Sequence, residues 1–299
     1  MTCMTFSRRA LCAAFAALAW LPSMAASAAP FASHRITVQI EGAGPDVVLI
    51  AGLNSSPRAW ATTVAALPGY RYHLVQVAGF AGVPAGGNRA GDVAAPVAEE
   101  IARYIAEAGL ARPAVIGHSM GGMIGLMLAA RHPDALARLM VVDMVPSLGP
   151  MFAGPDATPA QVEAVADRVA AGMRGASPAQ RAAAAAAIID SMVDNVPMRP
   201  VALQDSLASD QDVGARAYRE MIVTDLGPEL GRIVVPVTVL YVQPAGMPMT
   251  PAQVDAVYRN VYAPLAGVTL KRIPASAHFV MWDQPQRFQA EARAFLGPR

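Results

Sequence analysis

The chain has 299 residues, of which 54% are hydrophobic, and its formal net charge at neutral pH is +1. A chain of this length can bury one large apolar core, and its near-neutral charge gives it no long-range attraction for nucleic acid or an anionic membrane. The sequence contains no Gly-rich loop ending in Lys-Ser or Lys-Thr, no Cys/His spacing typical of a metal site and no internal repeat. The composition therefore predicts a globular protein of enzyme size.

The N-terminal segment has the pattern of a signal peptide. Arg8 and Arg9 form a positive region, residues 10–21 are apolar but too few to span a bilayer, and residues 26–28 read Ala-Ser-Ala, a small-residue cleavage site. We expect residues 1–28 to be removed and the protein to be periplasmic or secreted. Both the Sec and the twin-arginine routes fit this pattern, and an uncleaved membrane anchor is the alternative.

The first predicted elements are strands. A short strand is expected near residues 35–41, and the continuous apolar run at 46–50 is typical of a parallel strand covered on both faces. A polar turn follows at residues 51–60, Ala-Gly-Leu-Asn-Ser-Ser-Pro-Arg-Ala-Trp. Another buried strand is expected at 73–77, and a helix with one apolar face is expected over 92–105.

A serine lies at a sharp predicted turn. The apolar run 114–116 ends at Gly117, Ser119 follows, and Gly121 and Gly122 precede a second apolar run with helical composition. Glycines two residues before and after the serine let the strand and the helix approach closely. The serine is expected to have a strained backbone, and its hydroxyl would project beside a helix N-terminus, where N–H groups favour negative charge. The pattern predicts a nucleophile elbow.

The remaining segments alternate in the same way, with one exception. A buried strand at 139–143 closes on Asp143, and residues 146–232 then show Ala-rich helical stretches without a strand pattern. The helical stretches lie at 161–173, 178–192 and 212–224, and they are followed by a strand at 235–242, a helix at 250–261 and a strand at 268–273. Strands that alternate with helices predict right-handed βαβ units and a doubly wound parallel sheet.

Three stretches resemble the α/β-hydrolase family. Residues 117–122, Gly-His-Ser-Met-Gly-Gly, resemble its nucleophile elbow, and residues 275–285, Ala-Ser-Ala-His-Phe-Val-Met-Trp-Asp-Gln-Pro, resemble its histidine loop. Residues 51–60 resemble its oxyanion loop, although Ala51 replaces the usual histidine. The resemblance covers residues 35–296 and implies an α/β fold: a doubly wound, mostly parallel sheet flanked by helices, with a helical cap inserted after the sixth strand.

The same resemblance implies how the chain is organised. Residues 29–145 would form the first part of the hydrolase core, residues 146–232 the helical cap, and residues 233–299 the second part of the core.

The resemblance also implies the catalytic groups. Ser119 would be the nucleophile, and the N–H groups of Leu53 and Met120 would bind the oxyanion. Of the five histidines, only His278 lies on a loop after the last strand, where it could meet the serine, so it would be the general base. His118 is expected to point away from the side of the elbow on which its neighbour Ser119 lies.

The catalytic acid departs from the common family pattern. Most relatives carry it after the seventh strand, but residues 243–251 contain no Asp or Glu. Asp143 ends the strand next to the elbow strand, and some family members carry their acid there, so we expect Asp143 to fill this role. Asp255, inside the following helix, and a Ser-His dyad without an acid are the alternatives.

The expected activity is hydrolysis of carboxylic esters of small to medium apolar substrates through an acyl-enzyme, with no cofactor and no metal ion. A capped aminopeptidase of the proline-releasing type and a non-catalytic ligand-binding protein with the same fold are the alternatives. The peptidase would use an acidic pair drawn from Glu163, Asp190 and Asp194 to bind a free amine. We expect a small-molecule ester as the partner, no nucleic acid, and no stable membrane insertion after signal cleavage.

Overall fold

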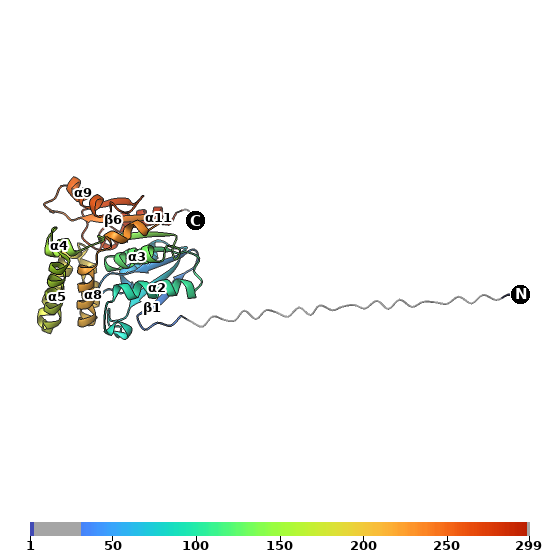
Figure 1. The fold of residues 1–299 in the computed structure, drawn as a ribbon, viewed down its shortest axis with the longest axis horizontal. Helices are drawn as coiled ribbons and strands as arrows, with labels where there is room; N and C mark the ends of the chain where they lie inside the picture. Colours follow the sequence, from blue (N-terminus) through green and yellow to red (C-terminus); the bar gives the residue numbers. More distant parts are fainter. Residues whose placement is uncertain (3–30, 298–299) are drawn as a thin grey trace. The chain divides into compact units, whose positions relative to one another are not determined.

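The computed structural model describes residues 1–2 and 31–297, and the chain divides into two units, Met1–Pro30 and Phe31–Arg299 (Figure 1). The expected signal peptide at residues 1–28 lies almost entirely outside the described residues and stays a prediction. None of the described helices is both long and apolar enough to cross a membrane.

The second unit is built on a seven-stranded sheet with the order β1-β3-β2-β4-β5-β6-β7. The strands are β1 (Ile36–Gly42), β2 (Asp46–Ile50), β3 (Arg71–Val77), β4 (Ala114–His118), β5 (Arg138–Val142), β6 (Val237–Gln243) and β7 (Thr269–Pro274). β1 pairs with β3 in the antiparallel direction, and all other pairs are parallel. The predicted doubly wound, mostly parallel sheet is confirmed.

The order of the strands places one switch point in the sheet. After β2 the chain crosses to β3 on one side, then returns to place β4 on the other side of β2 and continues to β7. Connections that leave β2 and β4 therefore diverge, and sheets of this kind have their ligand-binding crevice at the carboxyl ends of such strands. The turn at residues 51–56 and Ser119 both follow these two strands.

Apolar patterning explains which strands lie inside the sheet. In each of β2, β4 and β5 the last four residues are buried, as the continuous apolar runs predict for strands covered on both faces. β1, at the edge, instead has only Ile36 fully buried, and several of its polar side chains are exposed. Polar side chains on an edge strand keep it from pairing with another sheet.

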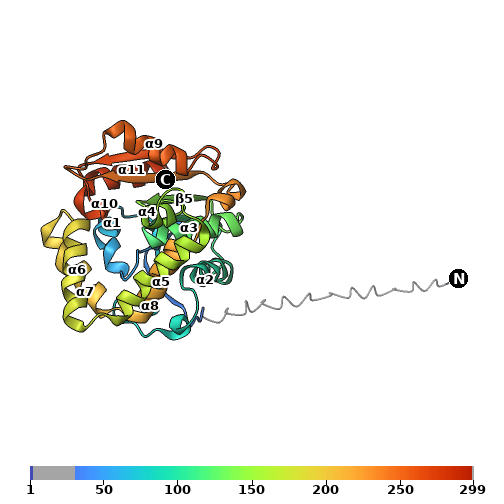
Figure 2. The same ribbon diagram turned by 60° about the vertical axis from the view of Figure 1, so that its left-hand side comes forward.

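Helices cover both faces of the sheet (Figures 1 and 2). α2 (Ala94–Glu107) and α3 (Met120–Arg131) pack against each other in one core cluster, to which Tyr262, directly after α9 (Pro251–Val261), also belongs. α1 (Ala61–Ala66), α10 (Val280–Asp283) and α11 (Pro285–Leu296) belong to the opposite layer, whose cluster includes Trp60, Trp282 and Phe288.

A helical segment, residues 149–232, lies between β5 and β6. It contains α4 (Gly149–Ala153), α5 (Pro159–Gly175), α6 (Pro178–Met192), α7 (Arg199–Ala208), α8 (Gln211–Val223) and short 3-10 helices at Val196–Met198 and Gly227–Arg232. Capping boxes at Thr158 and Ser177 begin α5 and α6, because each hydroxyl accepts from the N–H three residues on. In the described sheet this segment follows the fifth strand, β5. The expected position after the sixth strand was wrong for this sheet, because the prediction numbered the strands as in the family.

The helical segment is bonded to loops at the carboxyl edge of the sheet. The bonded pairs are Asp205 with Ser56 after β2, Asp210 with Gly79 after β3, Met192 with Phe279 and Asn195 with Asp283 after β7. These loops come from both sides of the switch point, so the segment lies against the edge where the crevice forms.

Gly121 and Gly172 provide a test of the close packing between β2 and α3. A Cβ added at Gly121 would lie 2.2 Å from the carbonyl oxygen of Ile50, whereas a Cβ at Gly172 in α5 would meet nothing within 4 Å. We expect Gly121→Ala to lower the free energy of unfolding by at least about 2 kcal/mol, and Gly172→Ala to raise it by about 0.5–1 kcal/mol. Urea denaturation measures both changes; two changes of the same sign would contradict the packing argument.

Candidate active site

Ser119 lies at the turn between β4 and α3 with φ 53° and ψ −122°. Its N–H donates to the carbonyl oxygen of Val142 at 2.9 Å, and its own carbonyl accepts from the N–H of Gly122 at 2.8 Å. A Cβ at Gly117 would lie 2.1 Å from the carbonyl oxygen of Gly121, so only glycine fits there. The strand, the strained serine and the helix predicted from the sequence are therefore present in this order.

Asp143 and His278 come together at the same edge of the sheet. His278, on the loop after β7, donates from Nδ1 to Oδ2 of Asp143 at 2.6 Å, and both side chains are mostly buried. The other carboxylate oxygen, Oδ1, accepts from the N–H of Val242 and from the hydroxyl of Tyr258, each at 3.2 Å. Asp143 is thus held by three donors and orients the imidazole of His278.

Asp255, the alternative acid, is bonded elsewhere. Its Oδ1 accepts from the hydroxyl of Tyr241 and from Nε of Arg272, each at 2.8 Å. The Tyr241 hydroxyl and, after it, the Arg272 guanidinium hold the pKa of Asp255 below its usual value. The structure therefore brings Asp143, and not Asp255, to His278.

The two expected oxyanion donors flank the elbow. Gly52 lies directly against it, since a Cβ at Gly52 would be 3.1 Å from Cβ of Ser119, and Leu53 is the next residue. Met120 begins α3, so its N–H belongs to the first turn, which has no intrahelical acceptor. Within residues 31–297, neither the N–H of Leu53 nor that of Met120 donates to a protein acceptor. Both N–H groups are therefore without a protein acceptor in this part of the chain.

Backbone strain gathers in the loops that carry these groups. Within residues 31–297, six residues other than glycine have a positive φ, and four of them follow β2, β4, β5 and β7: Asn54, Ser119, Asp143 and Ala275. Strained backbone of this kind costs roughly 1–3 kcal/mol per residue and is concentrated at functional sites. The strain therefore points to the carboxyl edge of the sheet as the functional region.

His118 is a neighbour of His278 that the sequence did not reveal. Its ring lies 4.6 Å from the ring of His278, and its Nε2–H donates to the carbonyl oxygen of His278 at 3.1 Å. The side chain is fully buried, and burial, followed by the nearby His278, lowers its pKa well below the usual value. His118 is therefore neutral and fixes the backbone of the histidine loop; only its position beside Ser119 could have suggested this role.

Tyr258 is a second residue that sequence reasoning missed. It lies on α9, one turn after Asp255, and its ring stacks on that of Tyr241 with centroids 4.0 Å apart. Burial, followed by the adjacent Asp143 carboxylate, raises its pKa well above the usual value, so its hydroxyl keeps the proton that it donates to Asp143. The sequence suggested Asp255 on α9 as a possible acid, whereas α9 supplies the Tyr258 hydroxyl as a hydrogen-bond donor to Asp143.

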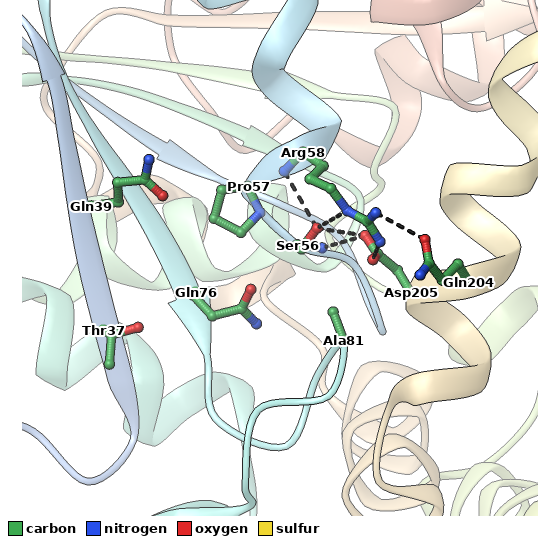
Figure 3. Close-up of a pocket in the computed structure, with 9 residues that line it drawn as sticks. All are labelled: Thr37, Gln39, Ser56, Pro57, Arg58, Gln76, Ala81, Gln204 and Asp205. Carbon is green, nitrogen blue, oxygen red and sulfur yellow. Dashed lines mark hydrogen bonds and ion pairs between the residues drawn. The ribbon is translucent and has the colours of Figure 1, made fainter.

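A pocket of about 490 Å³ lies beside the loop after β2 (Figure 3). It is lined by Thr37, Gln39, Ser56, Pro57, Arg58, Gln76, Ala81, Gln204 and Asp205. Ser119, Asp143 and His278 are not among its lining residues, so this pocket does not include the three side chains expected to be catalytic. Within the described ranges, no group of three or more His, Asp or Glu side chains could hold a metal ion.

Residues 47–291 match the profile of the alpha/beta hydrolase family, and the chain belongs to this family. RutD of Yersinia enterocolitica, named as a carbamate hydrolase, is 37% identical over 115 residues, which are 38% of this chain and 41% of RutD. The pimeloyl-[acyl-carrier protein] methyl ester esterase of Aeromonas hydrophila is 34% identical over 113 residues, 37% of this chain and 42% of the esterase. Each alignment thus spans less than half of the relative.

Solved structures agree on the fold. The crystal structure of a hydrolase from Pseudomonas aeruginosa superposes with a TM-score of 0.73 at 21% identity, covering 88% of this chain and 94% of the other. At this identity the similarity shows the shared fold and leaves the substrate open.

The low pKa of His118 predicts how stability depends on pH. Below about pH 6.5 the unfolded chain protonates this histidine but the folded chain does not. The free energy of unfolding therefore decreases as the pH is lowered, by up to about 1.4 kcal/mol per pH unit. His118→Gln keeps a side-chain N–H donor but does not titrate. Urea unfolding between pH 7.5 and 5 is expected to show a shallower slope for the variant; equal slopes would show that His118 does not carry this dependence.

Proposed function

We propose that this protein is a serine hydrolase that cleaves carboxylic esters of small to medium apolar substrates through an acyl-enzyme. The observation that carries the proposal is the 2.6 Å hydrogen bond from Nδ1 of His278 to Asp143, at the sheet edge that carries Ser119. A carboxylate on Nδ1 selects the tautomer in which Nε2 accepts a proton and stabilises the imidazolium that results. The relatives named as a methyl ester esterase and a carbamate hydrolase support hydrolysis of an ester-type bond.

In the proposed mechanism, Oγ of Ser119 forms a bond to the ester carbonyl carbon while Nε2 of His278 takes the hydroxyl proton. The N–H groups of Leu53 and Met120 donate to the resulting oxyanion. His278 returns the proton to the leaving alkoxide as the C–O bond breaks, which leaves an acyl-enzyme. Water, deprotonated by His278, attacks the acyl carbon, and the acid is released as Ser119 recovers its proton.

We infer that residues 146–232 form a cap over this site. Support comes from the hydrogen bonds that join the helical segment to the loops after β2, β3 and β7. The residues next to the proposed catalytic groups are apolar: Leu53 itself, Met120 after Ser119, Met144 after Asp143 and Phe279 after His278. An apolar acyl or alcohol group fits this surrounding better than a charged one.

The peptidase alternative finds less support in the structure. Glu163, Asp190 and Asp194, the carboxylates that would bind a free amine, are all exposed. Asp190 also forms an ion pair with Arg199 at 2.9 Å. An amine-binding site needs a carboxylate that is shielded from water, so the ester substrate is favoured.

Ser119→Ala is expected to lower kcat for ester hydrolysis by about 10⁴-fold or more and to abolish labelling by a fluorophosphonate probe. Asp143→Asn is expected to lower kcat by about 10³- to 10⁴-fold, because an amide cannot hold the imidazolium or its tautomer. A series of p-nitrophenyl acyl esters measures both rates and the preferred chain length.

Asp255→Asn is the matched control for the acid, since it makes the same change on a carboxylate bonded to Tyr241 and Arg272. Its kcat is expected to stay near that of the parent. Equal activity of Asp143→Asn and the parent would exclude Asp143 as the acid. Labelling of the Ser119→Ala variant by the fluorophosphonate probe would exclude Ser119 as the nucleophile. A parent that is neither active nor labelled would favour the ligand-binding alternative.

We further propose that residues 1–28 are a signal peptide and that the protein is periplasmic or secreted. The proposal rests on the positive, apolar and small-residue regions of this segment. Mass spectrometry of the protein from cell fractions is expected to find a chain that begins at residue 29 in the periplasm or medium. A chain that keeps residues 1–28 in the membrane fraction would support the uncleaved anchor instead.

A further inference from the structure

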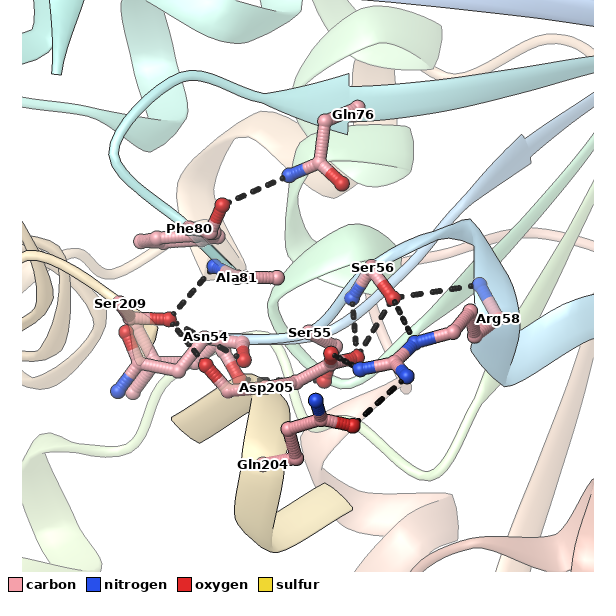
Figure 4. A network of polar contacts seen from close by, with 11 residues as sticks. Asn54, Ser55, Ser56, Arg58, Gln76, Phe80, Ala81, Gln204, Asp205 and Ser209 are labelled. Atoms are coloured by element: carbon pink, nitrogen blue, oxygen red, sulfur yellow. Dashed lines mark hydrogen bonds and ion pairs between the residues drawn. The ribbon is translucent and has the colours of Figure 1, made fainter. Parts of the chain in front are cut away.

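A buried carboxylate from α7 holds the loop that carries Leu53 (Figure 4). Oδ2 of Asp205, a residue only 3% exposed, accepts from the N–H of Ser56 at 3.1 Å and from its hydroxyl at 2.6 Å. The guanidinium of Arg58 binds the other oxygen, Oδ1, and donates to Oε1 of Gln204 at 2.9 Å. The bonds to the Asp205 carboxylate are charge-assisted, and such bonds are stronger than those between neutral groups.

Only a tight turn separates this anchor from the proposed oxyanion donor. The N–H of Ser55 donates to the carbonyl oxygen of Gly52 at 3.2 Å, and the Ser55 hydroxyl donates to that of Leu53 at 3.3 Å. Ser56 follows directly and is fixed to Asp205 by both its N–H and its hydroxyl. A displacement of Ser56 is therefore transmitted to Leu53, three residues away.

One polar group of the turn is left unsatisfied by the turn itself. Asn54 has φ 56°, and its buried Oδ1 has no hydrogen-bond partner among the described residues. An unpaired buried oxygen destabilises the turn. A contact from outside the turn offsets this, and α7 supplies it: Oδ2 of Asp205 accepts from the hydroxyl of Ser56 at 2.6 Å.

We propose that Asp205 is a positioning residue for the oxyanion hole: it fixes the turn after β2 so that the N–H of Leu53 faces the developing oxyanion. The proposal rests on the proposed function, since it needs an ester-cleaving site with Leu53 as a donor. Because Asp205 belongs to the helical segment, the way in which that segment packs on the core also controls the geometry of the oxyanion hole. The oxyanion exists only in the transition state, so a loss of this anchor lowers kcat and leaves KM nearly unchanged.

Glu220 offers a matched comparison within the same helical segment. It lies on α8, is also 3% exposed, and its carboxylate accepts the N–H groups of Val93, Ala94 and Ala95 at 2.6, 2.6 and 2.8 Å. These N–H groups belong to the first turn of α2 and not to the turn after β2. Glu220 thus ties the segment to the core with the same chemistry but without contact to the oxyanion loop.

The experiment compares Asp205→Asn and Glu220→Gln with the parent protein. For Asp205→Asn we expect kcat for a p-nitrophenyl ester to fall by about 10- to 100-fold, with KM changed by less than about 3-fold. Affinity for an alkylboronic acid, which forms a tetrahedral adduct with a serine nucleophile, is expected to fall by the same factor as kcat. For Glu220→Gln we expect a lower Tm, with kcat and boronic acid affinity within about 3-fold of the parent.

Ser56→Ala provides a milder second variant in case Asp205→Asn does not fold. It removes the 2.6 Å hydroxyl contact and keeps the backbone N–H bond to Asp205, so a loss in kcat of about 3- to 10-fold is expected. Unchanged kcat and boronic acid affinity in folded Asp205→Asn or Ser56→Ala, or an equal loss in Glu220→Gln, would overturn the proposal. A parent that hydrolyses no ester and takes no fluorophosphonate would instead overturn the proposed function.

Discussion

The close approach of β4, α3 and β2 around Ser119 is the constraint on which the rest of the site depends. Gly117 and Gly121 face backbone atoms at distances that no Cβ could occupy, and Gly121 touches the carbonyl oxygens at the end of β2. Between these two glycines Ser119 has φ 53°, and Gly52 of the turn after β2 lies against it. The serine turn and the turn after β2 thus meet because glycines without a Cβ let the two backbones touch.

The strain that this geometry stores is offset by groups far away in the sequence. The turn after β2 is held at Ser56 by Asp205, and the loop at His278 is held by His118 and by Asp143. In each case a buried polar side chain supplies the bond that the local sequence cannot. The helical segment therefore contributes to the loops of the hydrolase core as well as lying next to them.

Sequence reasoning succeeded where the signal was local. The continuous apolar runs predicted the parallel strands, and Gly117, Ser119 and Gly121 predicted the strand-turn-helix, because both patterns follow from backbone geometry within a few residues. It did not find the bond between Ser56 and Asp205, which are 149 residues apart. It also did not find the contact between His118 and the histidine loop, since His118 and His278 are 160 residues apart.

The position of the carboxylate shows why local patterns could not decide the acid. β5 and β6 are adjacent and parallel, with Val142 opposite Leu240, so loops leaving either strand begin at the same edge. A carboxylate after either strand can therefore reach the same imidazole, and here the N–H of Asp143 donates to the carbonyl oxygen of Leu240 at 2.7 Å.

In the proposed mechanism Asp143 takes the place of the acid, so the loop after β6 needs none, and the helix that follows this loop serves another purpose. That helix, α9, presents the hydroxyl of Tyr258 to the oxygen of Asp143 that His278 does not use. A neutral donor with a raised pKa stabilises the carboxylate without adding a second negative charge beside it. The position of Asp143 at the end of β5 thus lets the histidine loop and α9 each bind one oxygen of its carboxylate.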